Sequence, residues 1–315
     1  MKVLVVGGGP AGLYAAYRIK KSKPDAAITL VEQNAPNATF GFGVVFSDKA
    51  LDFLRDDDPE TYALIAPAME TWTDLTINHG GERIRIDGVG FAAIGRLTLL
   101  QLLQNRLASV GVTPRYETAL REAPRPTDYD LIIAADGVNS MVRTAGEFGT
   151  TVTPRANKFV WYGTTKPFST LTQTFVRTTE GHFNAHHYRY APDMSTFIVE
   201  CDAQTWCQMR FDTMTEAESA KVCEAIFAAT LQGHPLLTNR SLWRNFPNVW
   251  NDRWYHRNMV LVGDALRTAH FSIGSGTRLA LEDVIALADA LIANSFDVAK
   301  ALPAYQASRR PIVEK

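Results

Sequence analysis

Three glycines near the start of the chain have the spacing that phosphate-binding turns need. Gly7, Gly9 and Gly12 follow a short apolar run at residues 3–6 and precede a helical pattern. In such a strand–turn–helix unit the backbone can approach a pyrophosphate closely, and the helix directs its free N–H groups at the phosphates. Glu32 ends a second apolar run, where a carboxylate can bind a ribose hydroxyl. The pattern predicts a dinucleotide site; the alternative is a plain strand–helix–strand unit with a surface glutamate.

A second helix, late in the chain, also opens on glycines. Gly274 and Gly276 precede a helical pattern at residues 277–293, and an anion at that N-terminus would be stabilised by the helix dipole. Asp136 and Gly137 directly follow an apolar strand pattern. Such a pair is usually only a turn, but the carboxyl end of a parallel strand is also where ligands bind.

At other positions both a ligand contact and a plain structural role are open. Arg96 begins a helical pattern at residues 96–110, as a structural arginine or as a contact to a phosphate. Residues 40–47 mix glycines with large apolar side chains, which suits either an ordinary loop or close approach to a flat ligand. Helices are expected at residues 48–54 and 59–65.

Composition indicates a soluble globular protein. The 315 residues suffice for about two domains, and 46% hydrophobic with 21% charged residues is ordinary. A net charge of −1 gives no electrostatic reason to expect nucleic acid or an anionic membrane as a partner. Three cysteines without metal-ligand spacing indicate reduced thiols and no metal site. We expect a cytoplasmic enzyme, either monomer or homodimer.

Strand patterns change character along the chain. Apolar runs that alternate with helices, the last at residues 259–262 before Gly263 and Asp264, indicate a parallel sheet. Residues 71–78 and 82–86, and four runs between residues 159 and 201, alternate in the manner of antiparallel strands. A helix is expected at residues 216–231. We predict an α/β fold: a Rossmann-like domain with an inserted, mostly antiparallel β-sheet substrate domain. The first comprises residues 1–70, 93–150 and 256–315, and the second comprises residues 71–92 and 151–255.

Residues 7–13, 130–143 and 263–283, in this order, resemble the single-component FAD-dependent aromatic hydroxylases, the superfamily typified by para-hydroxybenzoate hydroxylase. The resemblance covers the whole chain. It implies a GR2-type FAD-binding domain, with Asp264 at the ribityl hydroxyls and Arg96 near the pyrophosphate. The residues predicted to bind FAD are Gly7, Gly9, Pro10, Ala11, Gly12, Glu32, Gln33, Val45, Arg96, Asp136, Gly137, Gly263, Asp264, Gly274, Ser275, Gly276 and Thr277.

Four further segments resemble a narrower branch of this family. It contains salicylyl-CoA 5-hydroxylase, the monooxygenase half of 2-aminobenzoyl-CoA monooxygenase/reductase and the tryptophan-derivative hydroxylase of violacein biosynthesis. The segments are residues 41–48, 159–163, 195–200 and 270–277, and residues 234–246 favour the acyl-CoA members. The chain departs from the general family at Arg267, Phe271 and Arg278, where the family has His, Pro and Asn. It also stops soon after Pro311, where the family normally adds further helices.

The resemblance implies an FAD- and NAD(P)H-dependent monooxygenase. Such an enzyme hydroxylates an activated aromatic ring through a flavin hydroperoxide, with NADH or NADPH as transient reductant and O2 as co-substrate. The expected substrate is a small aromatic, in particular an aromatic acyl-CoA such as salicylyl-CoA. A tryptophan- or indole-derived substrate is the alternative, and a non-hydroxylating flavin reductase or FAD-binding protein is the second alternative.

Candidate substrate residues lie on one expected strand and beside the flavin motif. Strand alternation puts His186 and Tyr188 on one face and His187 on the other. We predict that His186 and Tyr188 orient or deprotonate a phenol or aniline; hydrogen-bonded core or surface residues are an equal alternative. His270 and Phe271 adjoin the flavin motif and are predicted to line the substrate cavity.

Overall fold

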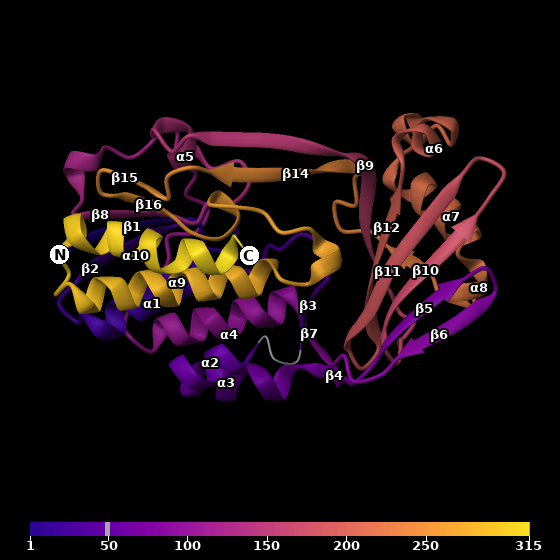
Figure 1. The fold of residues 1–315 in the computed structure, drawn as a ribbon, viewed down its shortest axis with the longest axis horizontal. Coiled ribbons are helices and arrows are strands. Elements are labelled where there is room, and N and C mark those ends of the chain that lie inside the picture. The colour runs from indigo at the N-terminus through magenta and orange to yellow at the C-terminus, as the bar shows by residue number, and fades with distance from the viewer. Residues whose placement is uncertain (48–50, 315) are drawn as a thin grey trace.

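The computed structural model describes residues 1–47 and 51–314. Figure 1 shows two lobes, an α/β lobe at the left and a large β-sheet at the right. The long strands β9 (Thr150–Thr164) and β14 (Arg244–Asn251) run from one lobe to the other. The helix expected at residues 48–54 begins outside the described residues, and α2 spans Asp52–Asp57.

A five-stranded sheet forms the centre of the α/β lobe, in the order β15–β16–β8–β1–β2. Four of its strands are parallel, and they are β1 (Lys2–Val6), β2 (Ala27–Val31), β8 (Leu131–Ala134) and β16 (Met259–Leu261). The short β15 (Tyr255–His256) closes the edge in antiparallel register. All four side chains of β8 are buried, because β8 lies in the middle of the sheet and both of its faces are covered, so the strand must be apolar throughout.

Four helices pack on this sheet. Helix α1 (Pro10–Ser22) lies between α9 (Gly276–Ala293) and α4 (Arg96–Ala108), and α10 (Val298–Val313) lies against α9. Helix α1 can approach β1 closely only because residue 12 has no side chain: a Cβ on Gly12 would collide with the carbonyl oxygen of Gly7. The shorter α3 (Pro59–Ile65) and α5 (Met141–Ala145) lie at the periphery of the lobe.

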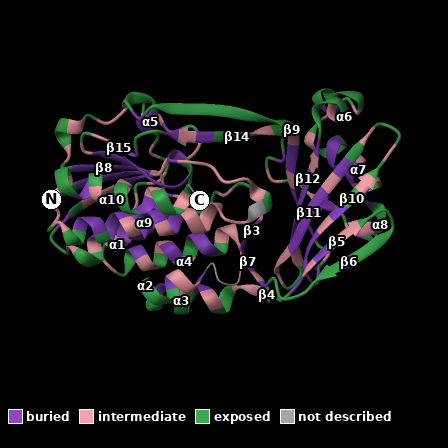
Figure 2. Ribbon diagram, viewed as in Figure 1, coloured by how far each residue is buried: buried purple, intermediate pink, exposed green. Residues whose placement is uncertain are grey.

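An eight-stranded sheet forms the second lobe. Its order is β13–β9–β12–β11–β10–β5–β6, with β14 paired to β9, and every pair is antiparallel except β10 with β5. The remaining strands are β5 (Leu75–His79), β6 (Glu82–Ile86), β10 (Leu171–Arg177), β11 (His182–Ala191), β12 (Met194–Cys201) and β13 (Leu236–Leu237). Figure 2 shows β11 and β12 largely buried and β6 exposed.

One face of the eight-stranded sheet is covered by helices. They are α6 (Ala203–Gln208), α7 (Glu216–Ile226) and α8 (Ala228–Leu231), and Phe197, Phe211 and Phe227 belong to the apolar core between them and the sheet. Thr215 caps α7 in a reciprocal pair with Glu218. The single helix expected at residues 216–231 is wrong, because the backbone of Phe227 leaves the helical region and divides it.

The single strand expected at residues 71–78 is also wrong. The chain crosses there from one sheet to another, so that β4 (Glu70–Trp72) joins a three-stranded sheet with β3 (Gly43–Ser47) and β7 (Phe91–Gly95), and β5 joins the large sheet. Asp74 marks the break: its buried carboxylate accepts hydrogen bonds from Thr73 and Arg85 instead of continuing the strand. The predicted α/β class with an antiparallel sheet is confirmed. The boundaries of the two domains stay a prediction.

Within the described residues no helix has both the length and the apolar character needed to cross a bilayer.

Candidate functional site

A cavity of about 330 Å³ lies where the carboxyl ends of the parallel strands meet the uncovered face of the large sheet. It brings together segments far apart in the sequence: the turn after β1, strand β3, the start of α4, the loop after β8 and the N-terminus of α9. Twelve of the predicted FAD-binding residues line it, namely Gly9, Pro10, Ala11, Val45, Arg96, Gly137, Gly263, Asp264, Gly274, Ser275, Gly276 and Thr277.

Two helix N-termini point their backbone at this cavity. A Cβ added to Gly9, before α1, or to Gly276, the first residue of α9, would meet no atom within 4 Å. Open space above unpartnered helix N–H groups is the arrangement that binds phosphate or another anion. Gly7 and Gly12 do not line the cavity; they shape the turn that carries Gly9.

Glu32 lies at the carboxyl end of β2, outside the lining of the cavity. One carboxylate oxygen accepts a hydrogen bond from the Gly8 N–H at 2.7 Å, and the other accepts one from the Asn34 N–H at 2.8 Å. Glu32 therefore ties the glycine turn to the loop after β2. Gln33 beside it is exposed.

Asp136 supports the cavity rather than lining it. Its Oδ2 accepts hydrogen bonds from the backbone N–H groups of Met141 and Val142, at 2.8 and 3.4 Å, at the start of α5. Its Oδ1 is buried and has no partner among the described residues. Gly137, next in the chain, lines the cavity with a positive φ of 75°.

Arg96 and Asp264 bring opposite charges to the same cavity. Burial lowers the pKa of the Arg96 guanidinium, and the Asp264 carboxylate opposes that effect. The surrounding protein raises the pKa of Asp264, and Arg96 and Arg267 lower it. The Arg96 guanidinium also lies 5.5 Å from the centre of the Trp161 ring, so it bridges the two lobes.

The sheet side of the cavity is aromatic. Trp161, Tyr188, Phe246 and Phe271 line it. The Tyr188 hydroxyl donates to the Gly43 carbonyl at 2.8 Å, and burial raises its pKa, so it stays protonated. Phe271 packs 4.9 Å from the ring of Phe159, which extends the aromatic wall onto β9.

Neither histidine predicted for the site lines the cavity directly. His186 lies just behind the lining: its ring is 5.6 Å from that of Tyr188, and its neighbour across the sheet is Ile198, which does line it. His270 packs against Phe246 and Phe271, and its Nδ1 is 2.8 Å from the Ser272 hydroxyl.

His186 is buried, at 1% exposure, and neither of its ring nitrogens has a hydrogen-bond partner among the described residues. Burial lowers the pKa of His186 to about 4, with a smaller contribution from His270. The Trp161 Nε1 and Asn184 Oδ1 atoms are likewise buried without a partner. Cross-strand pairing places Trp161, Ile198 and His186 in one row on one face of the sheet.

Two of the three departures from the general family are internal ion pairs. The Arg267 guanidinium donates to Asp283 on α9 at 2.8 Å, and Arg278 donates to Glu282 at 2.7 Å. Arg309 on α10 pairs with the same two carboxylates. Only the third departure, Phe271, reaches the cavity.

Sequence reasoning missed several lining residues, including Trp161, Ile198 and Phe246. Period-two alternation is the signal that could have found them, because Phe159 and Trp161 occupy alternate positions of β9 and share a face. Which face looks at the cavity depends on how the two lobes meet, and no local pattern encodes that.

The fold and the cavity define an FAD-binding protein. A family model described as "FAD binding domain" matches residues 88–315, and the chain belongs to this family. A model described as "NAD(P)-binding Rossmann-like domain" matches residues 5–38, which hold the first glycine turn.

Three curated relatives match the whole chain. A salicyloyl-CoA 5-hydroxylase from a Streptomyces species is 42% identical over 325 residues, and the chain spans 63% of its length. A 3-hydroxy-4-methyl-anthranilyl-[aryl-carrier protein] 5-monooxygenase from Streptosporangium sibiricum is 39% identical, with 85% of its length spanned. A protodeoxyviolaceinate monooxygenase from Chromobacterium violaceum is 35% identical, also with 85% spanned. The resemblance to this branch of the superfamily is confirmed.

Proposed function

We propose that the chain is a flavin-dependent monooxygenase that hydroxylates an electron-rich aromatic ring delivered as an acyl-CoA thioester. The observation that carries this proposal is the composition of the cavity. Glycine-opened helix ends form one wall, an aromatic sheet face forms the other, and Arg96 and Asp264 lie at the same cavity.

The residues present fit FAD. The open backbone at Gly9 suits a pyrophosphate, and Asp264 suits the ribityl hydroxyls. Gly276 begins α9, whose positive dipole end suits an electron-rich edge of the flavin ring. Bound FAD would accept a hydride from NADH or NADPH and activate O2 for transfer to the ring. The other predicted contacts follow from this placement, with Glu32 and Gln33 towards the adenosine end.

The chain's own task is to hold the substrate ring and exclude water. Phe271, Phe246 and Trp161 provide an apolar surface for a flat ring. His186 offers unpartnered nitrogens at the base of that surface, and its lowered pKa keeps the imidazole neutral at pH 7. A neutral imidazole with so low a pKa is a weak base, so we assign His186 to orienting the ring's hydroxyl or amino group. Tyr188 fixes Gly43 and the wall beside His186.

Two of the three relatives are named for substrates attached to a CoA or carrier-protein thioester. This favours an aryl thioester, with salicylyl-CoA as the first candidate. The Chromobacterium violaceum relative is named for protodeoxyviolaceinate, and it supports the alternative of an indole-derived substrate.

Substrate-stimulated oxygen consumption tests this function. FAD-loaded protein is mixed with NADH or NADPH and with salicylyl-CoA, 2-aminobenzoyl-CoA or a tryptophan derivative, and products are analysed by mass spectrometry. We expect one aryl thioester to stimulate O2 uptake and gain 16 mass units, the mass of one oxygen atom. Reductant consumption that no aromatic compound changes, with no hydroxylated product, would show a flavin reductase or a silent FAD binder instead.

A further inference from the structure

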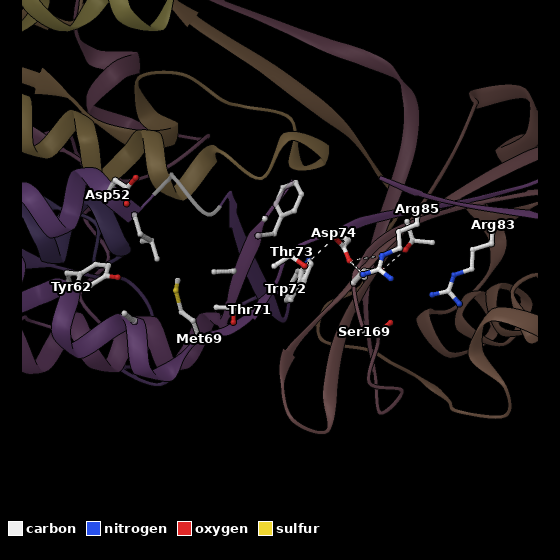
Figure 3. Close-up of a pocket in the computed structure, with 17 residues that line it drawn as sticks. Asp52, Tyr62, Met69, Thr71, Trp72, Thr73, Asp74, Arg83, Arg85 and Ser169 are labelled. Carbon is white, nitrogen blue, oxygen red and sulfur yellow. Dashed lines mark hydrogen bonds and ion pairs between the residues drawn. The ribbon is translucent and has the colours of Figure 1, made fainter. Parts of the chain in front are cut away.

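A second and larger cavity lies on the other side of the three-stranded sheet. This groove, about 740 Å³ in volume, runs from α2 and α3 past β4 to the exposed edge strand β6. Figure 3 shows Tyr62 and Met69 at one end and Arg83 and Arg85 at the other. The volume is that of a site for a large organic ligand. None of the residues assigned to FAD or to the aromatic side of the first cavity lines this groove.

The two ends of the groove differ in chemistry. Tyr62 and Met69 give one end an apolar surface, and Phe91, paired with Trp72 across the strands, continues it along the groove. The other end carries the Arg83 and Arg85 guanidinium groups and a row of hydroxyls, in which Thr76 Oγ1 lies 2.8 Å from Thr170 Oγ1. A ligand that fits both ends has a flat or apolar part joined to an anionic part.

The arginine pair is arranged to bind an anion. Arg83 and Arg85 are two residues apart on β6 and therefore share a face. Asp74, only 5% exposed, accepts a hydrogen bond from the Arg85 Nε at 2.7 Å and holds that guanidinium in place. No described carboxylate lies within 4 Å of the Arg83 guanidinium. Arginine with free N–H donors binds phosphate oxygens in bidentate fashion.

A single layer of side chains separates the groove from the 330 Å³ cavity proposed to bind FAD, called the flavin cavity below. Trp72 lines the groove, and its ring centre is 6.4 Å from that of Tyr188, which lines the flavin cavity. Val45 belongs to the same apolar cluster and also lines the flavin cavity. The Trp72 Nε1 donor is buried in this layer with no partner among the described residues. An unpartnered N–H there suits a ligand amide carbonyl.

We infer that the groove binds the phosphate-bearing end of a coenzyme A thioester, with Arg83 as the main phosphate contact, while its pantetheine arm passes Trp72 and places the aryl group in the flavin cavity. This inference rests on the proposed function for the aryl group, but the groove's affinity for coenzyme A is a separate property. The nucleotide supplies the flat part and the phosphates, and the arm supplies amide carbonyls for the Trp72 N–H. The aryl end reaches the ring-binding wall when the Trp72 side chain turns aside.

Calorimetric titration of the FAD-loaded protein with free coenzyme A tests the groove without any turnover. Arg83→Gln is the test variant, because Arg83 is exposed and has no ion pair to lose. Arg253→Gln is the control: its side chain is 65% exposed and lies outside the groove, and its ion pair with Glu147 is exposed and 4.0 Å long. We expect Arg83→Gln to weaken coenzyme A binding on the order of tenfold, the loss of one charge-assisted contact. Arg253→Gln should bind as the unchanged protein does.

A truncated substrate sharpens the test. An N-acetylcysteamine thioester of the same aryl acid carries no phosphate. Arg83→Gln should therefore raise KM for the coenzyme A thioester about tenfold, while KM for the truncated thioester stays the same. For both substrates kcat should stay the same. The inference would be overturned if coenzyme A did not bind, or if Arg83→Gln and Arg253→Gln bound it equally well. A KM change for NADPH alone would overturn it too. A requirement for a carrier protein in place of coenzyme A would overturn it as well. Coenzyme A binding that depends on Arg83, without hydroxylation of any thioester, would overturn the proposed function and support the groove.

Discussion

The two walls of the flavin cavity differ in whether backbone or side chains face the ligand. The wall on the α/β lobe presents backbone at three glycines: in the turn at Gly9, the loop at Gly137 and the start of α9 at Gly276. The wall on the large sheet is made of side chains, among them Trp161 on β9 and Phe246 on β14, and Phe271 packs against it from the loop before α9. Backbone presents the same N–H groups whatever the sequence, so it suits a constant cofactor. A side-chain wall can vary and suits the substrate.

The two faces of strand β11 repeat this contrast on a smaller scale. His187 faces the helices, stacks on Phe197 at 5.1 Å and pairs its Nε2 with the Thr174 hydroxyl at 2.9 Å. His186 faces the other way and has no partner for either ring nitrogen among the described residues. A buried polar group that stays unpaired costs free energy, and a ligand that pairs with it offsets that cost. On the helix-covered face His187 keeps one paired nitrogen, Nε2, and its Nδ1 has no partner among the described residues, whereas His186 has neither nitrogen paired. We infer that His186, which lies beside the cavity lining, is the histidine that meets a substrate.

The largest effect is expected at the backbone wall. Gly12→Ala forces a Cβ into the Gly7 carbonyl, so α1 must move away from β1 and carry Gly9 with it. We expect at least a hundredfold loss of FAD affinity, measured by fluorescence titration, and a fall in unfolding free energy of about 1–3 kcal/mol. The matched control is Gly80→Asn in the hairpin turn between β5 and β6, where a side chain meets no atom within 4 Å and asparagine tolerates positive φ. Unchanged FAD affinity in Gly12→Ala would remove the special role of the backbone wall.

The next effect separates the two faces of β11. His186→Phe removes two unpaired nitrogens, which favours the folded state, but adds volume at a buried position, which opposes it. We therefore expect the unfolding free energy to change by less than about 1 kcal/mol. The variant's KM for the aromatic substrate should increase about tenfold, through loss of a hydrogen bond to the ring substituent. Urea denaturation and steady-state kinetics measure the two quantities. A destabilised variant with unchanged KM would make His186 a core residue.

His187→Phe should show the opposite pattern. It loses the hydrogen bond to Thr174 and leaves that hydroxyl without the imidazole, so unfolding free energy should fall by about 1 kcal/mol. KM and kcat should stay unchanged, because Phe168 and Phe197 keep an aromatic ring as their neighbour. Equal kinetic effects in the two variants would erase the distinction between the faces.

The sequence was most informative where a site is local. The spacing of Gly7, Gly9 and Gly12 lies within one strand–turn–helix unit and predicts the backbone wall, because the same few residues set the turn and the helix start. The α/β class and the antiparallel sheet followed from strand periodicity. Alternation also put His186 and Tyr188 on one face, as their ring contact shows.

The sequence could not predict contacts between residues that lie far apart in the chain. Trp161 on β9 and Phe246 on β14 meet at the cavity through sheet register and the docking of the lobes. The break at Asp74 depends on an arginine eleven residues later, Arg85, which only the β5–β6 pairing brings to it. The expected strand at residues 71–78 failed for this reason.

A pH dependence of stability reports on His186 as well. The unfolded histidine binds a proton near pH 6.5, whereas burial lowers the pKa of folded His186 to about 4. The unfolded state therefore binds more protons between these values, and stability falls as the pH drops from 7 towards 4. His186 accounts for about 2 kcal/mol of unfolding free energy lost between pH 7 and 5. Denaturant titrations at both pH values should show that loss reduced by this amount in His186→Phe; an identical pH dependence in both proteins would contradict the buried neutral imidazole.

A crystal structure of the FAD-loaded protein would locate the flavin between the two walls of the cavity. We predict that the flavin ring lies between the N-terminus of α9 at Gly276 and the aromatic side chains of Phe271 and Trp161, with the pyrophosphate at Gly9. A flavin bound elsewhere, or a ring turned away from the large sheet, would contradict this prediction.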